Sequence, residues 1–138
     1  MLALVATWGM VGVIWTMQLV HYPLLGELSS FAPATAASDH ARRITWVVGP
    51  LMAVEGVAAL ALLVARPATM SAASAWVAAV LLAIALGSTV LMQVPQHTQL
   101  STGHDDAVVT ALIAGNWIRT IAWTAKGVLL TAVVVTQP

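Results

Sequence analysis

The segment that decides the fold is residues 107–136, AVVTALIAGNWIRTIAWTAKGVLLTAVVVT, an apolar stretch with a few polar side chains. Asn116, Arg119, Trp123 and Lys126 follow one another at intervals of three, four and three residues, which places them on one side of an α-helix. The other residues are mostly Val, Leu, Ile, Ala, Gly and Thr, as in membrane helices. A charged side chain at the bilayer centre costs about 2.5–3.5 kcal/mol, so we expect Arg119 to face protein or water.

The composition of the whole chain indicates a membrane protein. Of its 138 residues, 60% are hydrophobic and 7% are charged, and the mean hydropathy is +0.93. A soluble domain has about 25% charged residues, so this chain lacks the polar surface that water requires. The net charge is zero without a basic run, which argues against nucleic acid as a partner. The chain has no cysteine, which excludes disulfides and thiolate metal sites.

Four apolar segments, at about residues 1–25, 45–64, 74–94 and 107–136, are each long enough to cross a bilayer. We therefore predict one all-α domain over residues 1–138, an integral membrane antiparallel four-helix bundle whose partner is the lipid bilayer. The first segment has no basic region and no cleavage signal, which favours a retained helix over a signal peptide.

Helix boundaries follow from the residues between these segments. Tyr22-Pro23 is expected to end the first helix, because proline cannot continue the ladder of backbone hydrogen bonds. Residues 27–37 are rich in Ser, Ala and Pro and predict a loop, after which Ser38-Asp39 offers a helix cap. An aspartate of the pair Asp105-Asp106 is expected to cap the fourth helix.

Four spans put both termini on one side of the membrane, and most unusual polar residues fall toward the other side. These residues are Gln18, His21, His40, Arg42, Arg43, Gln93, His97, His104, Asp105 and Asp106. This asymmetry predicts a polar cup that is open to one membrane face, with Glu55, Asn116 and Arg119 at its floor. Counting Arg42 and Arg43 against Arg66 places the cup on the cytoplasmic side.

Glu55 and Arg119 are ionisable residues inside predicted spans. Ten residues separate Thr45 from Glu55, which puts the carboxylate about 15 Å deep, near the middle of the bilayer. We expect Glu55 and Arg119 to interact directly or through one water. Two interpretations of the pair stay open, a buried ion pair that fixes packing and a functional pair that carries a proton or anchors a substrate.

His21, His40 and His97 lie near the ends of three spans, so antiparallel packing brings them to the same membrane depth. We expect at least two of them to turn inward, close enough to share a metal, a water or a substrate atom. They are candidate catalytic residues and candidate ligands of a transition metal or haem. The open alternative is that each histidine sits singly at the membrane interface.

Other polar and aromatic residues are candidates for binding a substrate. Each also has a purely structural explanation, such as lipid contact for the arginines and helix packing for the others. The candidates are Gln18, Arg42, Arg43, Asn116, Trp117 and Trp123.

Four motifs resemble those of small bacterial four-span membrane proteins, and their layout is similar to that of the anthrone oxygenase-like group. The motifs are Gln18-Leu19-Val20-His21-Tyr22-Pro23-Leu24, His40-Ala41-Arg42-Arg43, Gln93-Val94-Pro95-Gln96-His97 and Asn116-Trp117-Ile118-Arg119-Thr120. The resemblance covers the whole chain. It implies oxidation of a flat, lipophilic aromatic or quinone-like substrate, and it implies a place in the bacterial inner membrane.

Two classes of function follow from these features. The first is a membrane oxidoreductase, expected to be oligomeric, that takes a lipophilic small molecule into the cup. Its catalytic candidates are His21, His40, Glu55, His97 and Arg119. The second is a non-catalytic membrane subunit or small proton-coupled transporter built around the pair of Glu55 and Arg119. Convergence of the histidines in one pocket would favour the first class.

Overall fold

The computed structural model describes residues 1–29, 31 and 35–136 of the chain. In this part the structure is all helical and contains no strand. The helices are α1 (Leu2–Thr16), the π-helical turn η1 (Met17–His21), α2 (Tyr22–Ser29), α3 (Thr35–Val64), α4 (Ala72–Ser88), the π-helical turn η2 (Thr89–Gln93), α5 (Val94–Leu100) and α6 (Asp106–Val135). The prediction of an all-α fold is confirmed.

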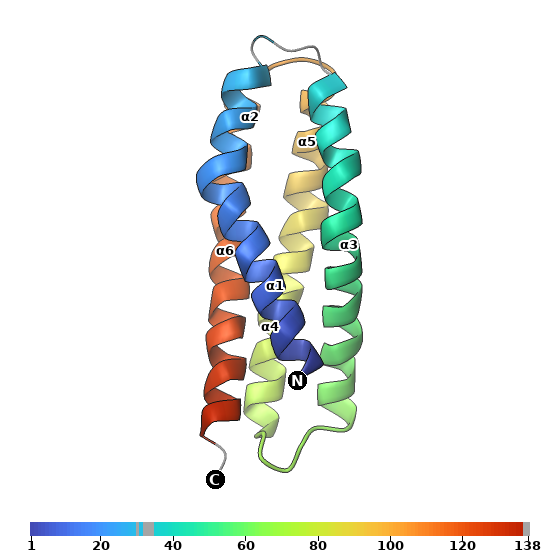
Figure 1. Ribbon diagram of the computed structural model, residues 1–138, viewed down its shortest axis with the longest axis vertical. Coiled ribbons are helices and arrows are strands. Elements are labelled where there is room, and N and C mark those ends of the chain that lie inside the picture. Colours follow the sequence, from blue (N-terminus) through green and yellow to red (C-terminus); the bar gives the residue numbers. More distant parts are fainter. Residues whose placement is uncertain (30, 32–34, 137–138) are drawn as a thin grey trace.

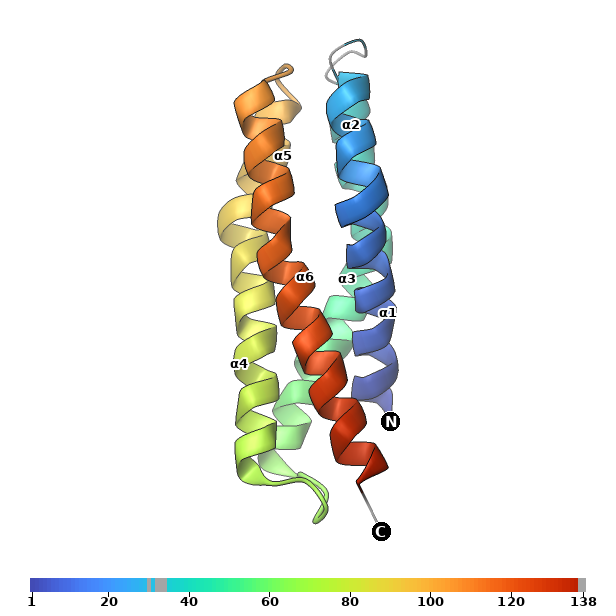
Figure 2. The same cartoon turned by 90° about the vertical axis from the view of Figure 1, so that its left-hand side faces the viewer.

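In the described part of the chain the helices form four long rods. The rods lie side by side, with the N- and C-termini at the same end (Figures 1 and 2). Two rods are composite, because α1, η1 and α2 are continuous and so are α4, η2 and α5. Within residues 1–29, 31 and 35–136, four helical stretches are long and apolar enough to cross a membrane: Leu2–Leu28, Ser38–Val64, Ala72–Leu100 and Asp106–Val135. At 1.5 Å per residue they measure about 40–45 Å, which exceeds the ~30 Å hydrocarbon core of a bilayer.

The two composite rods correct the predicted ends of the first and third spans. Neither Pro23 nor Pro95 ends its helix. Instead, the amide of Tyr22 donates to the carbonyl of Met17 five residues back, and Val94 makes the equivalent bond to Thr89 in η2. A proline lacks the N–H of the next turn and its ring crowds the carbonyl four residues back, so a wider turn before it relieves the clash.

The loop after α2 is shorter than predicted, because α3 already begins at Thr35. The predicted cap at Ser38-Asp39 is therefore wrong, since both residues lie inside α3. Residues 30 and 32–34 of the predicted loop lie outside the described residues.

The predicted aspartate cap of the last helix is confirmed. Asp105 has extended backbone angles, and its Oδ1 accepts hydrogen bonds from the amides of Ala107 at 2.8 Å and Val108 at 3.3 Å. These are two of the four amides that a helix N-terminus leaves without an internal partner.

Asp105→Ala should therefore lower the free energy of unfolding by about 1 kcal/mol, as loss of an N-cap side chain usually does. The measurement is unfolding in mixed detergent micelles, followed by circular dichroism. Asp106→Ala is the matched control, because Asp106 bonds His104 at 2.9 Å and does not cap the helix. Equal losses in the two variants would mean that the cap contributes nothing specific.

The core lies between α1, α4 and α6, and α3 is the outermost rod. One buried cluster joins Met10, Ile14, Ala85 and Trp123 across those three helices. Only 6% of the most apolar window of α3 is buried, against 39% for α6. The last helix thus lies at the centre of the packing, with its polar face against the other rods.

Candidate functional site

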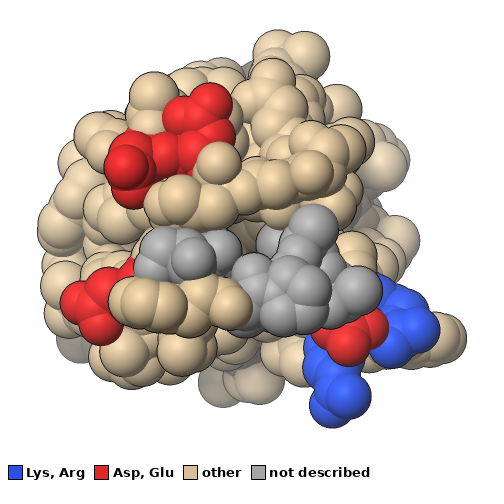
Figure 3. Space-filling view, turned by 90° about the horizontal axis from the view of Figure 1, so that it is seen from above, with Lys and Arg blue, Asp and Glu red and all other residues tan. Residues whose placement is uncertain are grey.

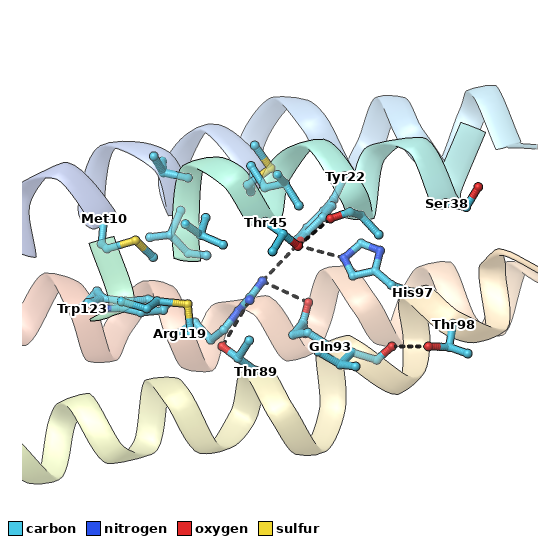
Figure 4. A pocket seen from close by; sticks show the side chains of 18 of the residues that line it. Met10, Tyr22, Ser38, Thr45, Thr89, Gln93, His97, Thr98, Arg119 and Trp123 are labelled. Carbon is cyan, nitrogen blue, oxygen red and sulfur yellow. Dashed lines mark hydrogen bonds between the residues drawn. The ribbon is translucent and has the colours of Figure 1, made fainter. Parts of the chain in front are cut away.

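Arg119 occupies the middle of α6 and is 7% exposed. Its Nε donates to Asn116 Oδ1 at 3.0 Å, and its Nη2 donates to the Tyr22 hydroxyl at 2.9 Å and to Gln93 Oε1 at 3.1 Å. The contact from Nη1 to Thr89 Oγ1 is longer, at 3.4 Å (Figure 4). All four acceptors are neutral. Among the described residues no acidic side chain forms an ion pair with this buried cation.

The side chains around Arg119 are themselves held in place. Asn116 Nδ2 donates to Gln18 Oε1 at 2.8 Å, which leaves the Asn116 oxygen to face the guanidinium. Gln93 Nε2 donates to the backbone carbonyl of Leu112 at 3.4 Å, so its oxygen also faces Arg119. Gln18 comes from η1 and Gln93 from η2. The two π-helical turns therefore carry the side-chain amides, Gln18 and Gln93, that orient Asn116 and Arg119.

A cavity of about 260 Å³ lies beside this network, between the first three rods and α6 (Figure 4). Its polar lining includes Tyr22, Thr89, Gln93, His97 and Arg119. The apolar lining includes Met10, Val13, Ile14, Met17, Ile44, Val48, Met52 and Trp123. The cavity thus has a mainly hydrocarbon wall with one cationic group on it.

Three histidines converge at the cavity, each from a different rod. His97 belongs to the cavity wall, and His40 and His21 lie beyond it. The ring centroids of His21 and His40 are 4.1 Å apart, and those of His40 and His97 are 5.3 Å apart. His97 Nε2 lies 3.4 Å from the Tyr22 hydroxyl. Three ring nitrogens are buried without a hydrogen-bond partner in the described part of the chain: His21 Nε2, His40 Nε2 and His97 Nδ1. The expected convergence is confirmed, and it involves all three histidines.

The arrangement of these rings does not favour the predicted metal or haem centre. Imidazole lone pairs lie in the ring plane, whereas the rings of His21 and His40 are stacked, with planes 29° apart. Within residues 1–29, 31 and 35–136, no group of three or more His, Cys, Asp or Glu side chains is placed to hold a metal ion. The structure gives the metal prediction no support.

Glu55 pairs with Lys126, and the predicted direct pair with Arg119 is wrong. The Lys126 ammonium lies 2.7 Å from Glu55 Oε1, which also accepts from the Thr7 hydroxyl. Glu55 Oε2 accepts from the indole N–H of Trp123. Glu55 is 0% exposed and Lys126 2%, so this is a fully buried ion pair. Glu55 does not line the cavity. Trp123 does, and its indole N–H bonds Glu55, so the Trp123 ring lies between the carboxylate and the cavity.

The remaining candidates lie away from the cavity. Arg42 is exposed and bonds Asp39 on its own helix at 2.8 Å, and Arg43 is also exposed. Figure 3 views the end that carries the α2–α3 connection, where basic side chains gather at one edge. Trp117 is 39% exposed and packs edge-on against Trp15, with centroids 5.6 Å apart. The role of Arg42, Arg43 and Trp117 in substrate binding stays a prediction, because none of them lines the cavity.

Two functional candidates, Tyr22 and Thr89, and the ion partner of Glu55, Lys126, are not among the residues that the sequence predicts for the site. Gln93 is among the residues of the predicted polar cup, but the sequence does not predict its bond to Arg119. Tyr22 is the only tyrosine of the chain and precedes a proline, and these two features could have identified it as a candidate site residue. Lys126 stood on the polar face of the last span, seven residues beyond Arg119.

Comparison with known proteins finds no match for this chain among protein-family models, curated proteins or solved structures. The resemblance to the anthrone oxygenase-like group therefore rests on the layout of the motifs alone.

Proposed function

We propose that the four rods insert into a bilayer as an antiparallel bundle, and that the cavity takes up a lipophilic molecule bearing a carbonyl or acidic oxygen. Arg119 would hold that oxygen, and the protein would act as an oxidoreductase on an aromatic ketone or quinone-like substrate. The observation that carries this proposal is a buried arginine that has no acidic partner among the described residues and lies on the wall of an otherwise mainly apolar cavity.

The charge of Arg119 favours an oxygen ligand. Burying a cation is costly unless hydrogen bonds or a counter-charge replace its water. Here four neutral groups supply part of that replacement. Nη1 carries two N–H donors, and in the described part of the chain it makes only the 3.4 Å contact to Thr89. A ligand carbonyl or anionic oxygen would complete this set.

The rest of the cavity favours a lipophilic ligand. Three methionines, Met10, Met17 and Met52, contribute to its wall, and methionine side chains adapt to irregular shapes. Its volume of about 260 Å³ lies just below the usual range for ligand pockets, about 300–1,000 Å³, which favours a small ligand. Because the cavity lies within the apolar length of the rods, such a molecule would enter from the bilayer.

Tyr22 and His97 can supply the acid–base chemistry of the proposed reaction. A ring CH₂ next to a carbonyl-bearing aromatic system would lose a proton to the Tyr22 hydroxyl, which passes its own proton to His97 Nε2. The enolate oxygen that forms would be stabilised by Arg119, as electrostatic stabilisation of a developing anion requires. Dioxygen would be the oxidant: the CH₂ becomes a carbonyl with one oxygen atom. The other oxygen atom leaves as water, which takes the second CH₂ proton and one proton from solvent in place of the proton that passed to His97.

The test is binding and oxidation of 1,8-dihydroxyanthrone by the protein in lipid nanodiscs. Binding is followed by quenching of tryptophan fluorescence, since Trp123 lines the cavity, and oxidation by absorbance of the quinone. Arg119→Gln should weaken binding about 10- to 150-fold, because a hydrogen bond to a charged group contributes about 1.5–3 kcal/mol.

Arg66→Gln is the matched control, because Arg66 is exposed at the end where the termini lie. It should bind the probe as the unaltered protein does. Equal affinity of Arg119→Gln and Arg66→Gln would contradict the proposal. Anthracene, which has the same ring system without oxygen, should bind equally to both variants.

A further inference from the structure

We propose that Tyr22, His97, His40 and His21 form a proton route between the cavity and the membrane face at the α2–α3 connection. These four side chains come from three rods, yet their rings form an unbroken series of neighbours. Tyr22 and His97 have centroids 5.7 Å apart, His97 and His40 5.3 Å, and His40 and His21 4.1 Å.

The inner end of the route is the hydroxyl of Tyr22. Its oxygen accepts a hydrogen bond from Arg119 Nη2 at 2.9 Å. A tyrosine hydroxyl has one proton of its own, and the arginine bond directs that proton away from the guanidinium. The acceptor that remains is His97 Nε2, at 3.4 Å. Both Tyr22 and His97 line the cavity, so a proton released there enters the route at Tyr22.

His97 can pass a proton across its ring. A neutral imidazole has one protonated and one free nitrogen, so it accepts a proton at one nitrogen and releases the other. His97 Nε2 faces Tyr22, whereas Nδ1 is buried and has no partner among the described residues. The nitrogen that must release the proton is therefore Nδ1, which has no hydrogen bond to the part of the chain that the structure describes.

The outer part of the route consists of His40 and His21. Neither lines the cavity, and both are half-buried. The Nε2 atom of each is buried without a partner in the described residues. Buried polar atoms are normally hydrogen-bonded, and buried waters commonly satisfy those that are not. Waters at these nitrogens would join the rings, because the nitrogens have no direct hydrogen-bond partner among the described residues.

Fixed charges give the route a direction. Arg119 lies at its inner end, and the exposed residues Asp39, Arg42 and Arg43 lie on α3 near its outer end. The buried guanidinium of Arg119 repels an additional positive charge more strongly than the exposed charges on α3 do, because the dielectric constant is lower inside the protein than at its surface. A proton that reaches His97 is therefore driven outward, away from the cavity.

The experiment measures proton exchange at His97 without any ligand. Protein with ¹⁵N-labelled histidine is placed in lipid nanodiscs, and NMR gives the rate at which the His97 ring N–H exchanges with water. His40→Phe keeps a ring stacked on His21 and removes both ring nitrogens, including Nε2, which is buried without a partner among the described residues. This variant should slow the exchange at least ten-fold.

His104→Phe is the matched control, because His104 bonds Asp106 and takes no part in the ring series. Its exchange rate should equal that of the unaltered protein. His21→Phe is the second route variant and should also slow the exchange, which covers the case in which His40→Phe does not fold. Equal exchange rates in the folded route variants and in His104→Phe would overturn the route.

This route would serve the proton transfer of the proposed function, but the two can fail separately. Fast exchange in every variant, with probe binding that still depends on Arg119, overturns the route and leaves the proposed function standing. Slow exchange in His40→Phe, without probe binding to the unaltered protein, supports the route and overturns the proposed substrate.

Discussion

Lys126→Met should lower the free energy of unfolding by about 3–5 kcal/mol, because it leaves the Glu55 carboxylate buried without its counter-charge. The two groups are 2.7 Å apart and almost inaccessible to solvent. Two other side chains, Thr7 and Trp123, donate to the same carboxylate, but both are neutral and cannot replace the ammonium. The measurement is reversible unfolding in mixed detergent micelles, followed by circular dichroism.

A double-mutant cycle separates the ion pair from the cost of changing each residue alone. Glu55→Gln should also destabilise, because it leaves the Lys126 ammonium unpaired. The double variant should lose clearly less than the two single losses combined, since neither charge is then left alone. Arg66→Gln, at an exposed residue, should change nothing. Additive losses would show that Glu55 and Lys126 do not act as a pair.

Trp123→Ala should cost about 3–5 kcal/mol, the range for removing a buried tryptophan or phenylalanine ring. Trp123 is 1% exposed, belongs to the core cluster with Met10 and Ala85, and donates its indole N–H to Glu55. The substitution removes the ring that separates the cavity from the ion pair. The measurement is the same unfolding experiment.

Trp123→Phe is the control that separates packing from hydrogen bonding. It keeps a six-membered aromatic ring at the site and removes the smaller ring of the indole, with the N–H that donates to Glu55. The expected loss is about 1–3 kcal/mol, the cost of leaving a buried polar group with one bond fewer. If Trp123→Phe were as destabilising as Trp123→Ala, the packing of the ring would contribute nothing.

The sequence was sufficient to predict one face of the last helix. The intervals between Asn116, Arg119, Trp123 and Lys126 depend only on helical geometry, and all four side chains are buried. The convergence of the histidines was predictable for a similar reason, because their distances from the ends of the spans set a common depth. Both results depend on positions along the chain and do not require knowledge of how the side chains pack.

The partner of Glu55 was not predictable in this way. Arg119 and Lys126 lie on the same face of α6, seven residues and therefore about 10 Å apart along the axis. Which of them meets Glu55 depends on the vertical register between α3 and α6. That register is set by the packing of many side chains along both rods, and no single motif records it.

The π-helical turns were missed because proline was read only as a helix breaker. A rigid ring at Pro23 forbids a regular α-helical turn before it, but a wider turn satisfies the same constraint. The choice between ending and widening depends on whether the following residues gain contacts by continuing. In α2 they do, since Tyr22 and Leu25 are buried against Leu100 and Leu112.

The two π-helical turns divide their rods into halves of different angular phase. Each adds one residue to a turn, so everything beyond it is rotated by about 100° from an uninterrupted α-helix. In the first rod, Thr7 before η1 faces Glu55, and Tyr22 after it faces Arg119. Deleting one residue within η1 would reset this phase, swinging Tyr22 off Arg119 while Thr7 keeps its place. The number of residues in η1 thus determines which side chains reach the cavity, but it does not affect the contact of Thr7 with the ion pair.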